Sequence, residues 1–389
     1  MRRWAFVMMA LGLTLGLRAR ADDTTAGDPL TQSIMHSLFD PMSKVLPLSL
    51  DDNAFKSAEH RGEITALLKD LQDHATVLEM HGKRKDRAFE FIAKSFKNDA
   101  KNIYRWYTHG AYDEAQFTLR NITDNCITCH SSLPEHHKFP PAQAFFKAVQ
   151  VDSLSPLAKA SYYVMSRQFD EALNSYEAYF KQKDVSPSTL VTQSAFIDYL
   201  KICANVKQDL ARPQRLIDAI TLRSDISTAT KAQLKRWSAT LAELDKRQSL
   251  RKTNLGDARE ILTHGRDQME YLRDRDGIIH YLVASAILNR YVHDHPDRGQ
   301  DVAEAYYMLG ITESLLGHSF WLSRTEFYLE SAIRLAPKAP FAPKAFDLLE
   351  QSYIASFSGS SGTHVPDDVR DLLAELQQMI TAPPSGKSH

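Results

Sequence analysis

The chain has 389 residues, 43% of them hydrophobic and 24% charged, so it carries enough apolar side chain for a large core and is neither a disordered tail nor a mini-protein. Three cysteines are too few for a disulfide framework in a chain of this length, and a formal net charge of −1 excludes a basic nucleic-acid-binding protein. Glycine is scarce, with 15 residues, while Ala, Leu, Lys, Glu, Gln and Arg recur. This composition predicts an all-α fold.

The first 21 residues have the pattern of a secretory signal peptide. Met1–Arg3 is a short basic start, Trp4–Leu17 is apolar, and Ala19–Ala21 is a small-x-small cleavage site. The alternative, a retained membrane anchor, needs about 20 apolar residues, and this run is shorter. We predict cleavage after Ala21, export to a bacterial periplasm and no membrane span in the mature chain. Of the 47 basic residues four arginines are then lost, which leaves 43 against 48 acidic ones and a net charge of −5.

Apolar residues at helical spacing predict three helices between residues 28 and 110. Asp28-Pro29 begins the first, with Asp as the N-cap and Pro at the first helical position, and Asp40-Pro41 is expected to kink or restart it. The second follows apolar positions 64–78 and ends near Gly82. The third covers positions 89–107 and is closed by glycine 110.

A fourth predicted helix brings two cysteines onto its apolar face. Its apolar positions follow one another at steps of 4, 3, 4 and 3, and they are Ala115, Leu119, Ile122, Cys126 and Cys129. Four such helices make a four-helix bundle whose facing side chains can enclose a cofactor. Another all-α packing of the same helices stays open, because periodicity fixes the faces of helices better than their topology.

The segment from Cys126 to His130 has the C-x-x-C-H spacing of c-type haem attachment. In such a site two thiols add across the haem vinyl groups and the adjacent imidazole ligates the iron. On a helix Cys126 and Cys129 stand one turn apart, and His130 lies on the same side. The sequence therefore predicts one covalently attached haem c, with His130 as the proximal iron ligand.

This motif has three alternative interpretations. A redox C-x-x-C pair of the thioredoxin type begins a helix after a strand, and no strand is predicted before Cys126. A structural zinc site needs a second ligand pair, and His136-His137 does not give a zinc spacing. A chance match is expected in about one such chain in a thousand. Export and helical position both favour haem.

Met35 is the candidate for the distal iron ligand. It lies one position off the apolar stripe of the first predicted helix, where a bundle would bring it across the core from the motif. Methionine opposite histidine raises the reduction potential and suits electron transfer. The alternatives are core filling, which is the usual role of a helical methionine, an open distal face, and Met42 beside Pro41. Further histidines are expected on the surface or in loops: His36, His81, His109, His136 and His137.

Residues 28–133 resemble the cytochrome c-prime superfamily, also called class II cytochromes c. The resemblance is carried by the Ile34-Met35-His36 segment, the Phe-rich third helix, the turn at 110–113 and, as its specific element, the haem motif. It implies a haem-binding bundle with Met35 on the iron in a low-spin protein, or an apolar distal face that binds small gases in a high-spin one. The sequence departs from the family at 131–134, where Ser-Ser-Leu-Pro replaces an aromatic and a basic residue.

From position 140 onward the pattern changes to antiparallel helix pairs. Two stretches have spacings similar to a tetratricopeptide unit, with small residues where helices cross and aromatic residues between them. The first contains Ala160, Tyr163, Ala172 and Tyr176, and the second contains Tyr306, Leu309, Gly310, Ala332 and Pro337. Residues 188–295 read as helices without a 34-residue period. We predict degenerate repeats that stack into a solenoid with a protein- or peptide-binding concave face, against the alternative of a non-repeating all-α domain.

The predicted organisation is a signal peptide at 1–21, a class II-like cytochrome c bundle at 22–139, a helical-repeat domain at 140–380 and a disordered tail at 381–389. Cys203 is expected to be a buried thiol, and 358–366 a Gly/Ser-rich loop.

Together these features predict a periplasmic mono-haem c-type cytochrome that transfers electrons, with the repeat region docking a redox protein partner. The alternative is a haem-based NO or CO binding or sensing protein with five-coordinate iron. The sequence contains no second haem motif, phosphate loop, G-x-S-x-G or H-E-x-x-H, so an electron carrier is favoured over an enzyme. Residues 22–141 hold 14 basic against 18 acidic side chains, which favours a basic partner.

Overall fold

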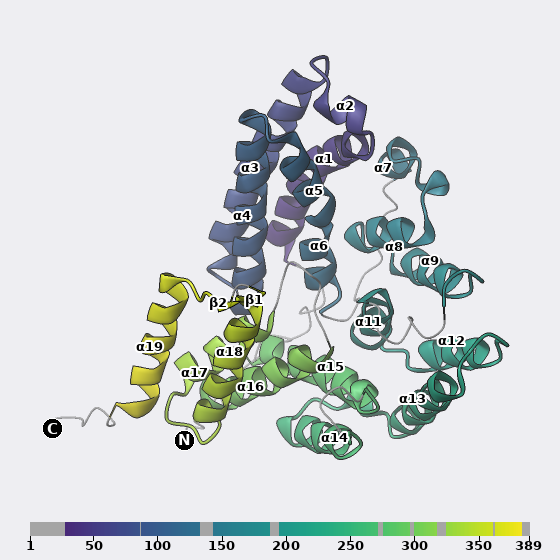
Figure 1. Ribbon diagram of the computed structural model, residues 1–389, viewed down its shortest axis with the longest axis vertical. Helices are drawn as coiled ribbons and strands as arrows, with labels where there is room; N and C mark the ends of the chain where they lie inside the picture. Colours follow the sequence, from purple (N-terminus) through teal and green to yellow (C-terminus); the bar gives the residue numbers. More distant parts are fainter. Residues whose placement is uncertain are drawn as a thin grey trace, which may run out of the picture.

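The computed structural model describes residues 28–85, 87–132, 143–186, 194–270, 275–295, 299–316, 324–360 and 362–382. The predicted signal peptide, His136-His137 and the predicted boundary at 139/140 lie outside these residues. The described part is almost entirely helical (Figure 1), which confirms the all-α fold class. One small antiparallel hairpin, β1 (Ser358–Gly359) with β2 (Gly362–Thr363), occupies the expected Gly/Ser-rich loop. None of the helices described combines the length and the apolar character needed to cross a membrane.

The N-terminal group of helices is built around one core. It consists of α1 (Pro29–Leu50), α2 (Asp52–Lys56), α3 (Arg61–Gly82), α4 (Arg87–Thr108), α5 (Tyr112–Asn121) and α6 (Thr123–His130). Around the core α1 packs on α3, α3 on α4, α4 on α5, and α5 again on α1. The shared cluster is formed by side chains such as Leu38, Leu68, Phe96 and Leu119. The predicted helices of this region are therefore all present.

The structure differs from two predicted details of this group. Of the kink or restart expected at Asp40-Pro41, the restart is absent: α1 continues through Pro41 and Pro47 to Leu50. Pro41, Val45 and Leu46 are buried, and this burial offsets the backbone hydrogen bonds that prolines remove. The fourth predicted helix is divided at Ile122 into α5 and α6. At the division the hydroxyl of Thr123 donates to the carbonyl of Arg120 and competes with the backbone.

The second group follows an arc beneath the N-terminal group (Figure 1). Its elements are α7 (Gln143–Ala148), η1 (Val151–Ser153), α8 (Pro156–Met165), α9 (Phe169–Phe180), α11 (Ser194–Lys201), the π-helical turn η2 (Ile202–Lys207), α12 (Ala211–Thr221), α13 (Thr228–Lys246), η3 (Ser249–Arg251), α14 (Leu255–Asp267), α15 (Ile278–Asp294), α16 (Gly299–Leu316), α17 (Arg324–Leu335), α18 (Ala342–Ser356) and α19 (Asp367–Thr381). Neighbours along the chain pack on each other, as in α8 with α9 and in α14 through α18. α19 extends one residue into the predicted tail.

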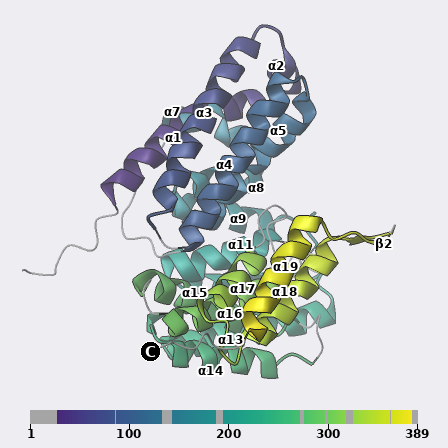
Figure 2. The same cartoon turned by 90° about the vertical axis from the view of Figure 1, so that its left-hand side faces the viewer.

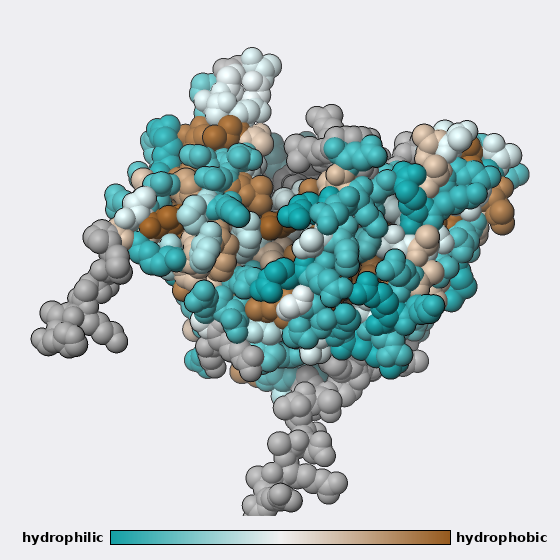
Figure 3. Space-filling view, turned by 90° about the horizontal axis from the view of Figure 1, so that it is seen from below, coloured by the Kyte–Doolittle hydropathy of each residue, from teal (hydrophilic) through white to brown (hydrophobic). Residues whose placement is uncertain are grey.

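α8 belongs to the cores of both groups. Its Tyr162 and Met165 lie in the cluster formed by the N-terminal helices, together with Phe145 of α7. Its Ala160 and Val164 lie in the larger cluster of the second group. The first helices after the predicted domain boundary therefore join the two groups. In both views the N-terminal group stands on one side of the arc (Figure 1 and Figure 2), and the face seen from below is mostly hydrophilic (Figure 3).

α16 and α17 approach each other closely at Gly310. A Cβ atom at this position would lie 2.5 Å from Cδ2 of Leu329, which is fully buried. Glycine inside a helix costs about 1 kcal/mol relative to alanine, so its presence here needs a packing reason. The helix crossing expected from the small residue at 310 is thus present.

We predict that Gly310→Ala lowers the free energy of unfolding by about 1–3 kcal/mol, because the buried Leu329 cannot move aside. The matched control is Gly62→Ala in α3, where no atom lies within 4 Å of the added Cβ. This control should raise the stability by about 0.5–1 kcal/mol. Chemical denaturation followed by circular dichroism measures both changes, and equal effects of the two substitutions would contradict the close crossing.

Candidate functional site

The Cys126–His130 motif lies on α6, at the junction of the two groups. α6 packs against α4 and α5 on one side and against α8 on the other. Cys126 packs on the N-terminal core, Ile127 belongs to the core of the second group, and Cys129 lines a cavity between the groups. Each of these motif side chains therefore has a different environment, although all come from one turn of helix.

The two cysteines of the motif are half-buried and form no disulfide. They stand one turn apart on α6, as the sequence predicts. The third cysteine, Cys203, is fully buried, and burial raises the pKa of its thiol, in agreement with the expectation of a buried thiol. Within the described ranges no three His, Cys, Asp or Glu side chains are grouped so that they could hold a metal ion.

The imidazole of His130 is held by the backbone of α8. Its Nδ1 lies 3.2 Å from the carbonyl oxygen of Val164, which can only accept, so Nδ1 carries the proton. Desolvation in the junction and the nearby charge of Arg167 lower the pKa of His130 to about 4, so the ring is neutral at pH 7. The Nε2 atom then bears a lone pair. Histidines that ligate a metal through one nitrogen commonly donate the other N–H to a carbonyl in this way.

Met35 lies on α1 at the level of the motif. The side-chain amide of Gln116 donates to the carbonyl of Ser49 over 2.8 Å, which fixes the register of α1 against α5. Met35 precedes Ser49 in α1 by 14 residues, which is about 21 Å of helix, and His130 follows Gln116 by 14 residues that are divided between α5 and α6. Met35 is half-buried and packs on the same core as Cys126. The two helices therefore bring these residues to one end of the N-terminal group.

The other predicted candidates for the distal ligand have distinct environments. Met42 is buried in the core of the N-terminal group. His81 was expected on the surface or in a loop, but it is buried because the end of α3 packs against the start of α1. Its Nε2 lies 2.7 Å from the hydroxyl of Thr31. His36 and His109 are exposed.

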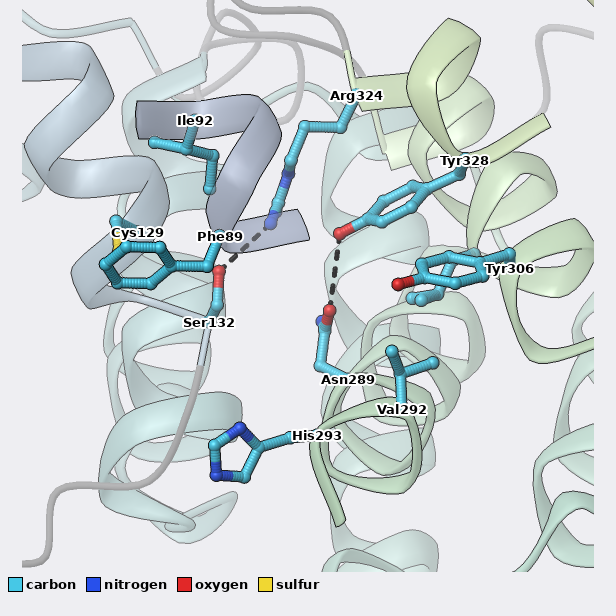
Figure 4. A pocket seen from close by; sticks show the side chains of 11 residues that line it. Phe89, Ile92, Cys129, Ser132, Asn289, Val292, His293, Tyr306, Arg324 and Tyr328 are labelled. Carbon is cyan, nitrogen blue, oxygen red and sulfur yellow. Dashed lines mark hydrogen bonds between the residues drawn. The ribbon is translucent and has the colours of Figure 1, made fainter. Parts of the chain in front are cut away.

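A cavity of about 60 Å³ separates Cys129 from the second group (Figure 4). Phe89 and Ile92 of α4 line its N-terminal side. α15, α16 and α17 supply the opposite wall, which includes Asn289 and Tyr328; the tyrosine hydroxyl donates to the asparagine side-chain oxygen over 3.3 Å. Pockets for whole organic ligands usually measure about 300–1,000 Å³, so this space accepts a small molecule or one edge of a larger one.

Residues far along the chain fix the end of α6, and sequence analysis missed them. Asn205 in the π-helical turn η2 donates to the carbonyl of Ser131 over 2.9 Å, and Arg324 donates to the hydroxyl of Ser132 over 3.0 Å. These partners are 74 and 192 residues apart in sequence, so no local pattern could reveal them. A π-helical turn is rare and often marks a functional region, and η2 was not predicted either.

Comparison of the chain with family models, with curated proteins and with solved structures found no match. The function of the site is therefore inferred from its own residues and their geometry.

Asp99 on α4 is hydrogen-bonded to the residue before the motif. The side-chain amide of Asn125 donates to a carboxylate oxygen of Asp99 over 2.9 Å. Burial raises the pKa of Asp99, and this hydrogen bond opposes the shift. The Oδ1 atom of Asn125 is buried and has no hydrogen-bond partner among the described residues. An amide in place of the carboxylate could donate to that oxygen.

We predict that Asp99→Asn raises the free energy of unfolding by about 0.5–1.5 kcal/mol at pH 7, the net value of one hydrogen bond. Because the folded-state pKa of Asp99 is raised, the stability of the wild type falls as the pH rises above the ordinary value of 3.8 towards the folded value. The advantage of the variant should therefore shrink below about pH 4. Thermal unfolding of both proteins from below pH 4 to pH 7 measures this difference in stability, and Asp347→Asn, at an exposed position, is the control. A stability difference between Asp99→Asn and the wild type that does not change with pH would contradict the prediction.

Proposed function

We propose that this chain is a periplasmic mono-haem c-type cytochrome that transfers electrons, with one haem c attached through Cys126 and Cys129 and His130 as the proximal iron ligand. The observation that carries the proposal is the hydrogen bond from Nδ1 of His130 to the carbonyl of Val164. It orients the ring and leaves Nε2 for the iron, next to two thiols at the attachment spacing.

The donor set of the site fits a covalently attached haem. Two thiols that are not oxidised to a disulfide and one neutral imidazole are the groups that attachment and proximal ligation require. The cavity beside Cys129 is smaller than a whole cofactor, so attachment there requires the side chains of Phe89, Ile92 and the second group to separate. The bound haem supplies one-electron redox chemistry. The chain positions the imidazole and excludes water with the apolar residues around Cys126.

The packing supports a class II-like cytochrome bundle at 22–139 followed by a tetratricopeptide-like region. The contacts of α1 with α3, α3 with α4, α4 with α5 and α5 with α1 are those of four helices around one core. The pairs α8 with α9 and α16 with α17 coincide with the two stretches of repeat-like spacing. The periplasmic location rests on the signal-peptide pattern at 1–21.

We propose further that the repeat-like region docks a redox protein partner, or a peptide segment of one, and that the acidic balance of residues 22–141 favours a basic partner. The face of the arc towards the N-terminal group already contacts the motif through Val164, Asn205 and Arg324. Docking would therefore use the outward surface instead of the concave face predicted from the sequence, and part of the outward surface is mostly hydrophilic in Figure 3. No nucleic acid is proposed as a partner.

A second candidate function is the binding or sensing of NO or CO by five-coordinate iron. The observation that favours it is the small cavity beside Cys129, which is lined mainly by apolar and aromatic side chains of α4 and of α15–α17. A cavity of this kind suits a diatomic molecule. A high-spin spectrum of the wild-type protein with rapid CO binding would favour this function over electron transfer.

We predict that the double substitution Cys126→Ala and Cys129→Ala abolishes covalent haem, because both vinyl attachment points are lost. The protein is expressed in a host that matures c-type cytochromes, and haem staining on a denaturing gel and the intact mass report attachment. Cys203→Ala is the matched control and should keep one haem, since that thiol is buried in the second group. A wild-type protein that carries no haem under these conditions would contradict the proposal.

We predict that Met35→Ala converts a low-spin, six-coordinate spectrum into a high-spin one, because the distal ligand is removed. Optical and electron paramagnetic resonance spectra of the oxidised protein measure the change. Met80→Ala is the control, since Met80 lies exposed on α3. An unchanged spectrum of the Met35 variant would show that another group, or none, occupies the distal position.

A further inference from the structure

Three charged side chains form a buried cluster next to the end of the motif. Lys201, the last residue of α11, donates to Glu313 of α16 over 3.0 Å, and Arg324, the first residue of α17, lies 3.4 Å from the other carboxylate oxygen of Glu313. Lys201 is 9% exposed, and Glu313 and Arg324 are each 4% exposed. Arg324 also donates to the hydroxyl of Ser132, two residues after His130. The cluster therefore joins three helices of the second group to the motif segment.

The cluster holds an excess of positive charge. Its ion pairs join two cations to one carboxylate, counted over the residues that the structure describes. Buried charges are stable when they are balanced and hydrogen-bonded, and an excess charge away from water is costly. Arg324 is also the first residue of a twelve-residue helix, whose positive dipole end adds to the local potential. An anion of one negative charge would complete the balance.

Arg324 faces a space into which such an anion would fit. It lines the cavity of about 60 Å³ together with Cys129, Ser132 and Tyr328. Figure 4 shows its guanidinium pointing towards Ser132, on the side of the cavity where Phe89 and Cys129 lie. A single water needs only about 10–15 Å³, so the cavity has room for an anion of a few heavy atoms. The hydrogen bonds to Ser132 and Glu313 use two of the five guanidinium N–H groups.

We propose that Arg324, held by Glu313 and Lys201, is the binding site of one small planar monoanion, a carboxylate or an oxyanion, in the cavity beside Cys129. The guanidinium fork matches such a group with two parallel hydrogen bonds. The anion has two possible sources, a free ion or a carboxylate of the haem. The second source rests on the proposed function, whereas the first is independent of it.

The test is calorimetric titration of the purified full-length mature protein with nitrate, a planar monoanion that is a poor ligand for haem iron. The wild type should bind one nitrate, and Arg324→Gln should bind it about tenfold more weakly or worse, because a charge-assisted pair is lost. Arg334→Gln is the matched control on the same helix. Arg334 pairs with Glu375 at the surface, so its variant should bind nitrate like the wild type.

A second variant separates a loss of binding from a loss of folding. Glu313→Gln removes the carboxylate of the cluster and leaves two cations, so it should bind nitrate about tenfold more tightly than the wild type. A damaged fold would weaken binding in both variants. Where the wild type binds nitrate, unchanged binding by Arg324→Gln overturns the proposal, and so does weaker or unchanged binding by a Glu313→Gln protein whose circular dichroism spectrum is that of the wild type.

The two sources of the anion give different results. If a haem carboxylate occupies the site, the haem-containing wild type does not bind nitrate. The haem-free Cys126→Ala, Cys129→Ala variant then does, and adding Arg324→Gln removes that binding. If neither protein binds nitrate, the site proposal is wrong. Haem staining of the wild type reports on the proposed function separately, so each of the two proposals can fail without the other.

Discussion

The hydrogen bond between His130 and the carbonyl of Val164 is the interaction on which the arrangement of the site depends. It joins the last residue of α6 to α8, and α8 contributes side chains to the cores of both groups. The orientation of the imidazole is therefore tied to the packing of the whole junction. Desolvation at the junction lowers the pKa of His130 and keeps the ring neutral, which is the form that can bind a metal through Nε2.

A second set of contacts encloses the motif from the far end of the arc. Phe327 of α17 stacks on Phe91 of α4 with ring centroids 4.6 Å apart, and Arg324 reaches Ser132. The second group thus meets the motif end of the N-terminal group at both α8 and α17. Solvent exposure, hydrogen bonding and nearby charge set the potential of a haem centre, so residues remote in sequence would tune a group attached to α6.

Much of the local structure could be predicted, because it depends on neighbouring residues. Capping preferences predict the cap at Asp28 and the ends of α3 and α4. The 3.6-residue period predicts that both motif cysteines lie on one helix. Two of the differences from the predictions share one cause. Proline at position 41 is tolerated because its neighbours are buried. His81 is buried because it packs against another helix, where its imidazole is hydrogen-bonded to the hydroxyl of Thr31. Each of these outcomes depends on tertiary contacts.

The sequence by itself determined the helical class, the motif and its spacing, since these are properties of short segments. Only the tertiary structure decided what surrounds the motif. Its surroundings are the carbonyl that orients His130, the π-helical turn that presents Asn205, and the charged cluster of Lys201, Glu313 and Arg324. The most distant of these residues, Arg324, is 192 residues from its partner Ser132, which follows the motif. Their proximity depends on the curvature of the arc, which is the sum of many helix-packing angles and has no signature in any one segment.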